Sequence, residues 1–129
     1  MPAIHSELTL LIIDWLNSNF DMGDMLVFVD DPILNSEKPP RIGSSIPDVY
    51  AKLLIENIEI IGEAKPGYDL TTSRTEKQLT DYISYIAKNK STSLIVSTEQ
   101  NTISVARKVL YPILLKAGVE PSRVVYLCP

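Results

Sequence analysis

The spacing of apolar and polar positions along the chain predicts three helices. Apolar residues recur at i, i+3, i+4 and i+7 over residues 6–19, the stripe of a helix packed on a core, with Ser6 as its cap. The sequence SRTE at 73–76 has the spacing of a capping box, so a second helix is expected to start there. A third helix is predicted over residues 101–117, ended by Gly118.

Short apolar runs between these helices predict five strands. They lie at residues 25–29, 48–55, 58–65, 94–97 and 123–127. Only Glu56 and Asn57 separate the second strand from the third, which predicts a tight hairpin. The resulting order is αβββαβαβ. The first three strands are expected to form an antiparallel meander, and the helical connections allow parallel pairing later on. We therefore predict an α/β fold with a central mixed sheet flanked by helices.

The predicted hairpin brings three charged side chains together. With a two-residue turn, Asp48 lies opposite Lys65 and Tyr50 lies opposite Glu63. Opposed residues share a face of the sheet, and so do residues two apart. Asp48, Glu63 and Lys65 are therefore expected on one face at one end of the hairpin. Diagonal neighbours lie roughly 7–8 Å apart, close enough for two carboxylates to share one divalent ion.

Two carboxylates with a neighbouring lysine suit the cleavage of phosphodiesters. Carboxylate oxygens are the ligands that Mg²⁺ and Mn²⁺ prefer, and such an ion activates water and offsets the charge of the transition state. The lysine ammonium can stabilise the phosphate as negative charge develops. The alternative is an exposed hairpin in which Asp48 and Lys65 form a surface ion pair worth about 0–1 kcal/mol.

These residues also resemble a known signature. Pro47-Asp48 followed by Glu63-Ala64-Lys65 resembles the motif of the PD-(D/E)XK nuclease superfamily. The order αβββαβ is similar to the common core of that superfamily, and residues 62–83 are similar to small stand-alone bacterial members in which an Asp, an Arg and a Gln follow the sequence GEAK. The resemblance covers roughly residues 4–97 and implies a restriction-endonuclease-like fold.

The resemblance assigns roles to the motif residues. It implies that Asp48 and Glu63 bind Mg²⁺, with Mn²⁺ as a substitute, and that the carbonyl of Ala64 completes the ligand set. Lys65 would position the attacking hydroxide or stabilise the phosphate. Glu7 would be a further ligand from the first helix, or only an acid that favours the helix dipole.

Three further residues are candidates for contact with water or substrate. Gln78 would orient water or Lys65, or else face solvent on its helix. Arg74, near the start of the second helix, and Arg41, in the polar loop at residues 35–45, would bind substrate phosphates or remain solvated. His5 is the only histidine and is interpreted as a surface residue near the N-terminus.

Composition limits the class of protein. The 129 residues suit a single domain over 1–129, no apolar run reaches the length of a membrane span, and the single cysteine excludes an intramolecular disulfide. No signal peptide is evident, so a cytoplasmic location is expected. Net charge is −4, with −8 in residues 1–64 and +4 in residues 65–129. A monomer is therefore expected to bind nucleic acid weakly and with strong salt dependence, and a homodimer would double the contacts.

Three functions remain open from the sequence. The first is a Mg²⁺-dependent nuclease that hydrolyses phosphodiester bonds, with DNA as its expected substrate, acting as an endonuclease or on a particular DNA structure. The second is a catalytically inactive module with the same fold, acting with a protein partner. The third is an unrelated α/β domain with a chance match to the motif.

Overall fold

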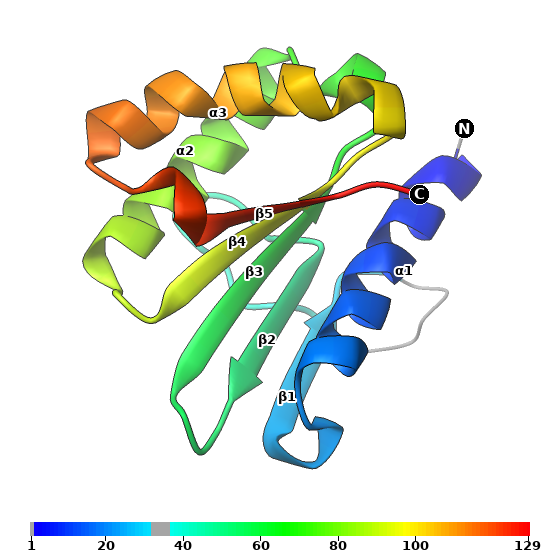
Figure 1. Ribbon diagram of the computed structural model, residues 1–129, viewed down its shortest axis with the longest axis vertical. Helices are drawn as coiled ribbons and strands as arrows, with labels where there is room; N and C mark the ends of the chain where they lie inside the picture. The colour runs from blue at the N-terminus through cyan, green and yellow to red at the C-terminus, as the bar shows by residue number, and fades with distance from the viewer. Residues whose placement is uncertain (1, 32–36) are drawn as a thin grey trace.

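A single mixed sheet of five strands organises the molecule (Figure 1). The computed structural model describes residues 2–31 and 37–129, with side chains of the first helix from residue 4 onward. Strands β1, β2 and β3 are antiparallel, whereas β3, β4 and β5 are parallel, in the spatial order β1-β2-β3-β4-β5. The predicted α/β fold and the αβββαβαβ order are therefore confirmed. The strands are β1 (Met25–Val29), β2 (Val49–Leu53), β3 (Ile58–Ala64), β4 (Thr92–Ser97) and β5 (Val124–Leu127).

Helices cover both faces of this sheet and divide the core in two. Helix α1 (Pro2–Asn19) packs on one face, and helices α2 (Ser73–Lys88) and α3 (Ile103–Ala117) pack on the other. Alternate residues of each strand point to opposite faces, so neighbouring residues of β3 belong to different cores. The α1 core contains the fully buried side chains Leu8, Ile12, Leu16 and Ile95. The opposite core contains Ile61, Leu79, Tyr82, Ile83, Ile86 and Leu110.

Two helix starts differ from the predicted ones. Helix α1 begins at Pro2, not at Ser6, because proline is favoured at a first helical position where no backbone donor is needed. Helix α2 is capped by Thr72, whose hydroxyl accepts from the Thr75 N–H at 3.2 Å, one residue before the predicted cap at Ser73. Helix α3 ends as predicted at Gly118, which has the left-handed φ of 69° that glycine tolerates.

The hairpin register also differs from the prediction. The turn has four residues, 54–57, with Asn57 at φ 57°, so Leu53 pairs with Ile58 and Tyr50 pairs with Ile61. The strands are thus offset by two residues from the predicted pairing. Because side chains repeat every two residues, this offset leaves each residue of the strand on its predicted face. The hydroxyl of Tyr50 consequently bonds Glu59 near the start of β3, far along the strand from Glu63.

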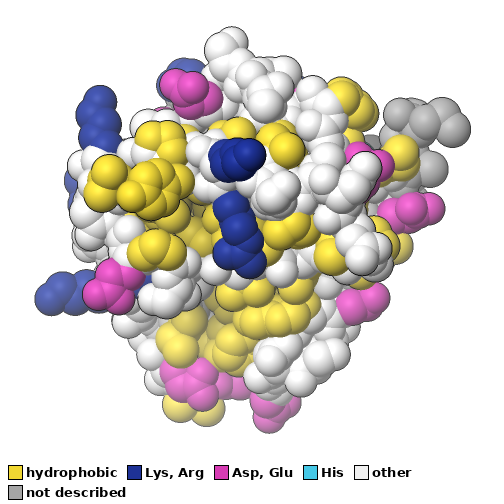
Figure 2. Space-filling model, turned by 45° about the horizontal axis from the view of Figure 1, so that its top comes forward, with side chains coloured by type: hydrophobic (Ala, Val, Ile, Leu, Met, Phe, Trp, Pro, Cys, Tyr) yellow, Lys and Arg dark blue, Asp and Glu magenta, His cyan; other side chains and the backbone are white. Residues whose placement is uncertain are grey.

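The outer side of α3 carries apolar side chains that are exposed to solvent. Tyr111 and Leu115 are 62% and 69% exposed, and Figure 2 shows hydrophobic patches on this side of the molecule between a few basic side chains. A pocket of about 630 Å³ lies between α2 and α3, lined by residues such as Ile83 and Ile113. Within the described residues, no helix combines the length and the apolar character that crossing a membrane requires.

Candidate active site

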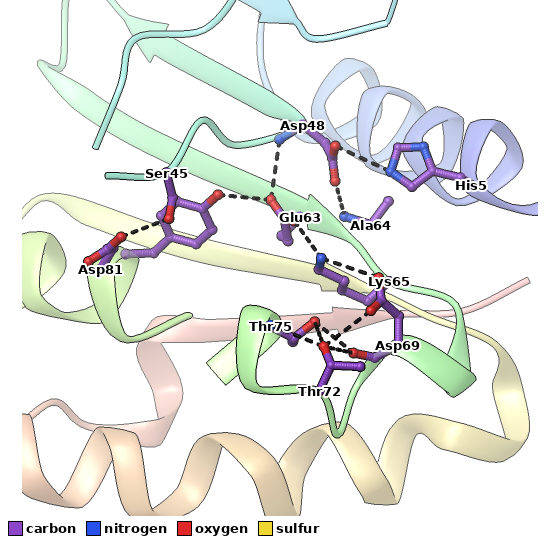
Figure 3. Close-up of polar contacts among 11 residues, drawn as sticks. His5, Ser45, Asp48, Glu63, Ala64, Lys65, Asp69, Thr72, Thr75 and Asp81 are labelled. Carbon is purple, nitrogen blue, oxygen red and sulfur yellow. Dashed lines mark hydrogen bonds and ion pairs between the residues drawn. The ribbon is translucent and has the colours of Figure 1, made fainter. Parts of the chain in front are cut away.

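Three motif side chains meet at one end of the sheet, where β3 and β4 end and β2 begins (Figure 3). In open α/β sheets this carboxyl end of the parallel strands is the usual place for ligands. The backbone N–H of Asp48 donates to Glu63 Oε1 at 3.3 Å, and Lys65 Nζ lies 3.4 Å from Glu63 Oε2. The hydrogen bond joins residues fifteen apart in the sequence, so the hairpin assembles this cluster. We name Asp48, Glu63 and Lys65 the acid–lysine cluster.

Glu63 is the buried centre of the acid–lysine cluster. Its side chain is only 3% exposed, and Oε1 also accepts from the hydroxyl of Tyr82 on α2 at 3.1 Å. Burial raises the pKa of Glu63 to about 8, and the nearby charge of Asp48 adds to this rise, while Lys65 and Tyr82 oppose it. Keeping Glu63 ionised at this position therefore costs free energy, and a nearby cation reduces that cost.

Lys65 lies between two carboxylates. Its side chain is 5% exposed, and Nζ lies 3.4 Å from Glu63 Oε2 and 3.5 Å from Asp69 Oδ2. A buried ammonium needs such partners, because removing it from water without them is costly. The two carboxylates fix the amine at the end of the sheet and limit its freedom to turn toward solvent.

The start of helix α2 holds Asp69 in place. The hydroxyls of Thr72 and Thr75 donate to the Asp69 carbonyl at 3.0 and 2.6 Å, and Thr72 also donates to Asp69 Oδ1 at 3.2 Å. The preceding turn is fixed by Gly67, whose N–H donates to Glu99 Oε1 at 2.8 Å. A side chain at Gly67 would collide with Thr102, so this close approach requires glycine.

Asp48 stands immediately before β2, and its carboxylate turns along the end of the sheet. Asp48 Oδ2 accepts from the N–H of Ala64 at 2.8 Å, and Oδ1 lies 3.2 Å from His5 Nε2 on α1. The side chain is 14% exposed, so solvent reaches it, unlike the more deeply buried Glu63. As predicted, Glu63 and Lys65 share one face of the sheet. The Asp48 carboxylate instead contacts the Ala64 N–H at the end of β3 and His5 on α1.

His5, like Tyr82, contacts the cluster and was missed by sequence reasoning. The hydrogen bond to Asp48 raises its pKa, against the opposite effect of partial burial, with further support from the charge of Asp48 and Glu63. Placing the helix start at Ser6 left His5 outside the apolar stripe. In the structure, His5 lies three residues before Leu8 on the same helix, and i, i+3 residues share a face. Extending the stripe backward would have found it.

Two other predicted residues form no described contact with the acid–lysine cluster. Glu7 is exposed on α1, and no hydrogen bond or ion pair joins it to the cluster in the described part of the chain. Its role as a ligand stays a prediction. Gln78 is half-buried on α2 and likewise has no described contact with Lys65, although its Oε1 atom is buried without a hydrogen-bond partner among the described residues.

Arg41 and Arg74, 33 residues apart in sequence, come together in one pocket of about 360 Å³. We name it the basic pocket. Besides the two arginines it is lined by Asp30, Ser44, Ser45, Ile46, Lys77 and Gln78.

Helix α2 holds the loop that carries Arg41. Asp81 accepts from the Ser45 hydroxyl at 2.7 Å and from the Ser44 N–H and hydroxyl at 3.2 and 3.1 Å. Burial acts to raise the pKa of Asp81, but these hydrogen bonds and the charge of Lys77 outweigh it and lower the pKa. Gly43 turns beside this carboxylate with φ 63°.

Comparison with family models, curated proteins and solved structures finds no match to this chain. Function is therefore inferred from the residues and their geometry. Asp48 and Glu63 supply the hard oxygen donors that Mg²⁺ and Mn²⁺ prefer, and the raised pKa of Glu63 marks a place that a cation stabilises. Among residues 2–31 and 37–129, no three His, Cys, Asp or Glu side chains are already gathered as a metal centre. Backbone oxygen and water would have to complete the ligand set.

Proposed function

We propose that this chain is a Mg²⁺- or Mn²⁺-dependent nuclease of the PD-(D/E)XK type that hydrolyses phosphodiester bonds in DNA. The observation that carries the proposal is the buried Glu63–Lys65 pair, 3.4 Å apart, with Asp48 hydrogen-bonded beside it. A surface ion pair would leave its side chains exposed to solvent, whereas Glu63 and Lys65 are both buried. The arrangement combines ligands for a hard cation with a fixed ammonium group, and both can promote phosphodiester hydrolysis.

Asp48 and Glu63 would hold the ion, with the carbonyl of Ala64 as the third ligand that the motif implies. When bound, a divalent ion supplies an activated water and charge neutralisation at the phosphate. Asp48 is well suited to a ligand role because the Ala64 N–H and His5 fix both of its oxygens in orientation. His5 thus acts as a positioning residue for Asp48.

Lys65 would stabilise the phosphate as charge develops on it. Its ammonium is held by Glu63 and Asp69, so little reorganisation is needed when substrate arrives. Electrostatic contacts that are prearranged in this way act mainly on the transition state, and therefore on the rate more than on substrate affinity. Removing one such contact typically lowers the rate about 10²–10³-fold.

A nuclease assay with matched variants tests the proposal. Purified protein is incubated with duplex, branched and single-stranded DNA in Mg²⁺, Mn²⁺ or EDTA. Asp48→Asn is expected to lose both metal binding and cleavage. Lys65→Met, which keeps most of the buried stem, is expected to lose cleavage and keep the stabilisation by metal. Glu59→Gln and Lys52→Met, on the same hairpin but outside the site, are the controls and should cleave like wild type.

The outcomes separate the enzyme from its alternative. Absence of cleavage by wild type on every substrate in Mn²⁺ would favour the inactive binding module. Cleavage by wild type that persists in Lys65→Met would show that the assigned site is wrong. Cleavage that continues unchanged in EDTA would rule out dependence on a divalent ion.

A further inference from the structure

The basic pocket carries positive charge that the protein itself leaves uncompensated. Among the described residues, neither Arg41 nor Arg74 forms an ion pair, and the Arg41 guanidinium bonds only the Ser44 carbonyl, at 3.2 Å. Lys77 lies 3.9 Å from Asp81 and is 66% exposed. Because Lys77 pairs with Asp81, the lining leaves two guanidinium groups beside one carboxylate, that of Asp30. The pocket is therefore electropositive in a chain whose net charge is −4.

Gln78 adds an amide oxygen, unpaired among the described residues, to the lining of the pocket. Its Oε1 atom is buried and has no hydrogen-bond partner in the part of the chain that the structure describes. An amide oxygen only accepts hydrogen bonds, so a donor such as water would satisfy it, whereas a phosphate oxygen would not. Ser44 and Ser45 do not take this role, because their hydroxyls donate to Asp81.

Two short segments of the chain connect the basic pocket with the acid–lysine cluster. Ile46 lines the pocket and precedes Asp48 by two residues, which span at most about 7 Å. Gln78 precedes Tyr82 by four residues on α2, a rise of about 6 Å on the same helix face, and Tyr82 donates to Glu63. A chain-like ligand can therefore contact the pocket and the cluster at once.

We infer that the basic pocket binds a phosphate group of the nucleic-acid strand, next to the phosphate that the acid–lysine cluster cleaves. This inference rests on the proposed function. Two unpaired guanidinium groups in one pocket suit phosphate, because each presents a planar fork of donors. The hydrogen bonds of Asp81 to Ser44 and Ser45 hold the loop of Arg41 before substrate arrives, so that Arg41 and Arg74 line the same pocket. The bound group is either a backbone diester or a terminal phosphate, which share this chemistry.

A binding experiment without cleavage tests the inference. Fluorescence anisotropy in EDTA measures the affinity of a short DNA, with and without a 5′-phosphate, between about 50 and 200 mM salt. We expect Arg41→Ala/Arg74→Ala to bind about tenfold more weakly than wild type. One lost phosphate contact should reduce the salt slope by about 0.9 for duplex or 0.7 for single-stranded DNA. An effect confined to the 5′-phosphorylated DNA would identify a terminal phosphate.

Two controls isolate the pocket from overall charge. Lys88→Ala removes an exposed cation from the last turn of α2, about 21 Å along the helix from Arg74, and should leave the affinity and the slope near those of wild type. Asp30→Asn removes the acidic lining residue and should strengthen binding. Both arginines are exposed, so unchanged melting temperatures are expected to confirm that the double variant is folded.

Each combination of results decides between the two proposals. If the double variant binds like Lys88→Ala while wild type cleaves DNA, the pocket inference is overturned and the nuclease stands. If binding depends on both arginines but nothing is cleaved in Mn²⁺, the pocket stands and the catalytic proposal fails. If wild type binds no DNA at about 50 mM salt, both are overturned.

Discussion

Removal and addition of divalent metal should change the stability of this protein by a measurable amount. The carboxylates of Asp48 and Glu63 lie at the same end of the sheet, and burial together with the charge of Asp48 raises the pKa of Glu63. A bound cation relieves this cost only in the folded state, so it stabilises that state by RT ln(1 + [M]/Kd). For Kd of about 10⁻³ to 10⁻⁴ M, 10 mM metal contributes about 1.4 to 2.7 kcal/mol.

The corresponding thermal shift follows from chain length. The unfolding entropy of a 129-residue domain is about 270 cal/mol/K, so the melting temperature should rise by roughly 5–10 °C. Differential scanning fluorimetry compares EDTA with 10 mM MnCl₂ or MgCl₂ at matched ionic strength. Asp48→Asn keeps an oxygen to accept from the Ala64 N–H but loses the charge, and should show no shift. An equal shift in Asp48→Asn, or none in wild type, would refute a metal site at these carboxylates.

Further predictions concern the residues that support the site. Gly43→Ala should destabilise the fold by about 1–3 kcal/mol in urea unfolding, since φ is 63° and a Cβ would lie 2.7 Å from Asp81 Cγ; Gly118→Ala, with φ 69° and open space, should cost less. The lowered pKa of Asp81 means that its contribution is present at neutral pH and is lost as pH falls below about 3.8; Asp81→Asn should flatten that loss in acid-unfolding curves. Tyr82→Phe removes a hydrogen bond that lowers the pKa of Glu63, so metal titration should give an affinity about tenfold weaker; unchanged affinity would contradict this.

Much of the architecture could be predicted from local pattern alone. Helices and strands follow from apolar periodicity, and Gly118 ends α3 as predicted because only its backbone conformation matters there. The exact start of a helix does not follow from the pattern, because several neighbouring residues can cap. Thr72 rather than Ser73 caps α2, since its hydroxyl also bonds Asp69 in the preceding turn. A capping-box pattern does not include this hydrogen bond, so it could not predict the cap at Thr72.

The hairpin shows why a wrong register can still leave side chains on their predicted face of the sheet. The turn is two residues longer than predicted, yet Glu63 and Lys65 keep their face because the pleat repeats every two residues. The resemblance indicates Glu7 as the acid of α1, whereas the structure brings His5 to Asp48. Helix rotation decides between them, since residues two apart point to nearly opposite sides.

The sequence by itself determined the order of elements, the two apolar faces of the sheet, and the set of Asp48, Glu63 and Lys65 on one hairpin. These depend on short-range periodicity and turn chemistry. Tertiary structure alone decided the burial of Glu63, the contact of His5 with Asp48, and the meeting of Arg41 with Arg74. Each of these contacts joins separate elements. The relative placement of the elements is set by the packing of both cores on the sheet and by the hydrogen bonds of Asp81 to the loop of Arg41. No local sequence pattern encodes that placement.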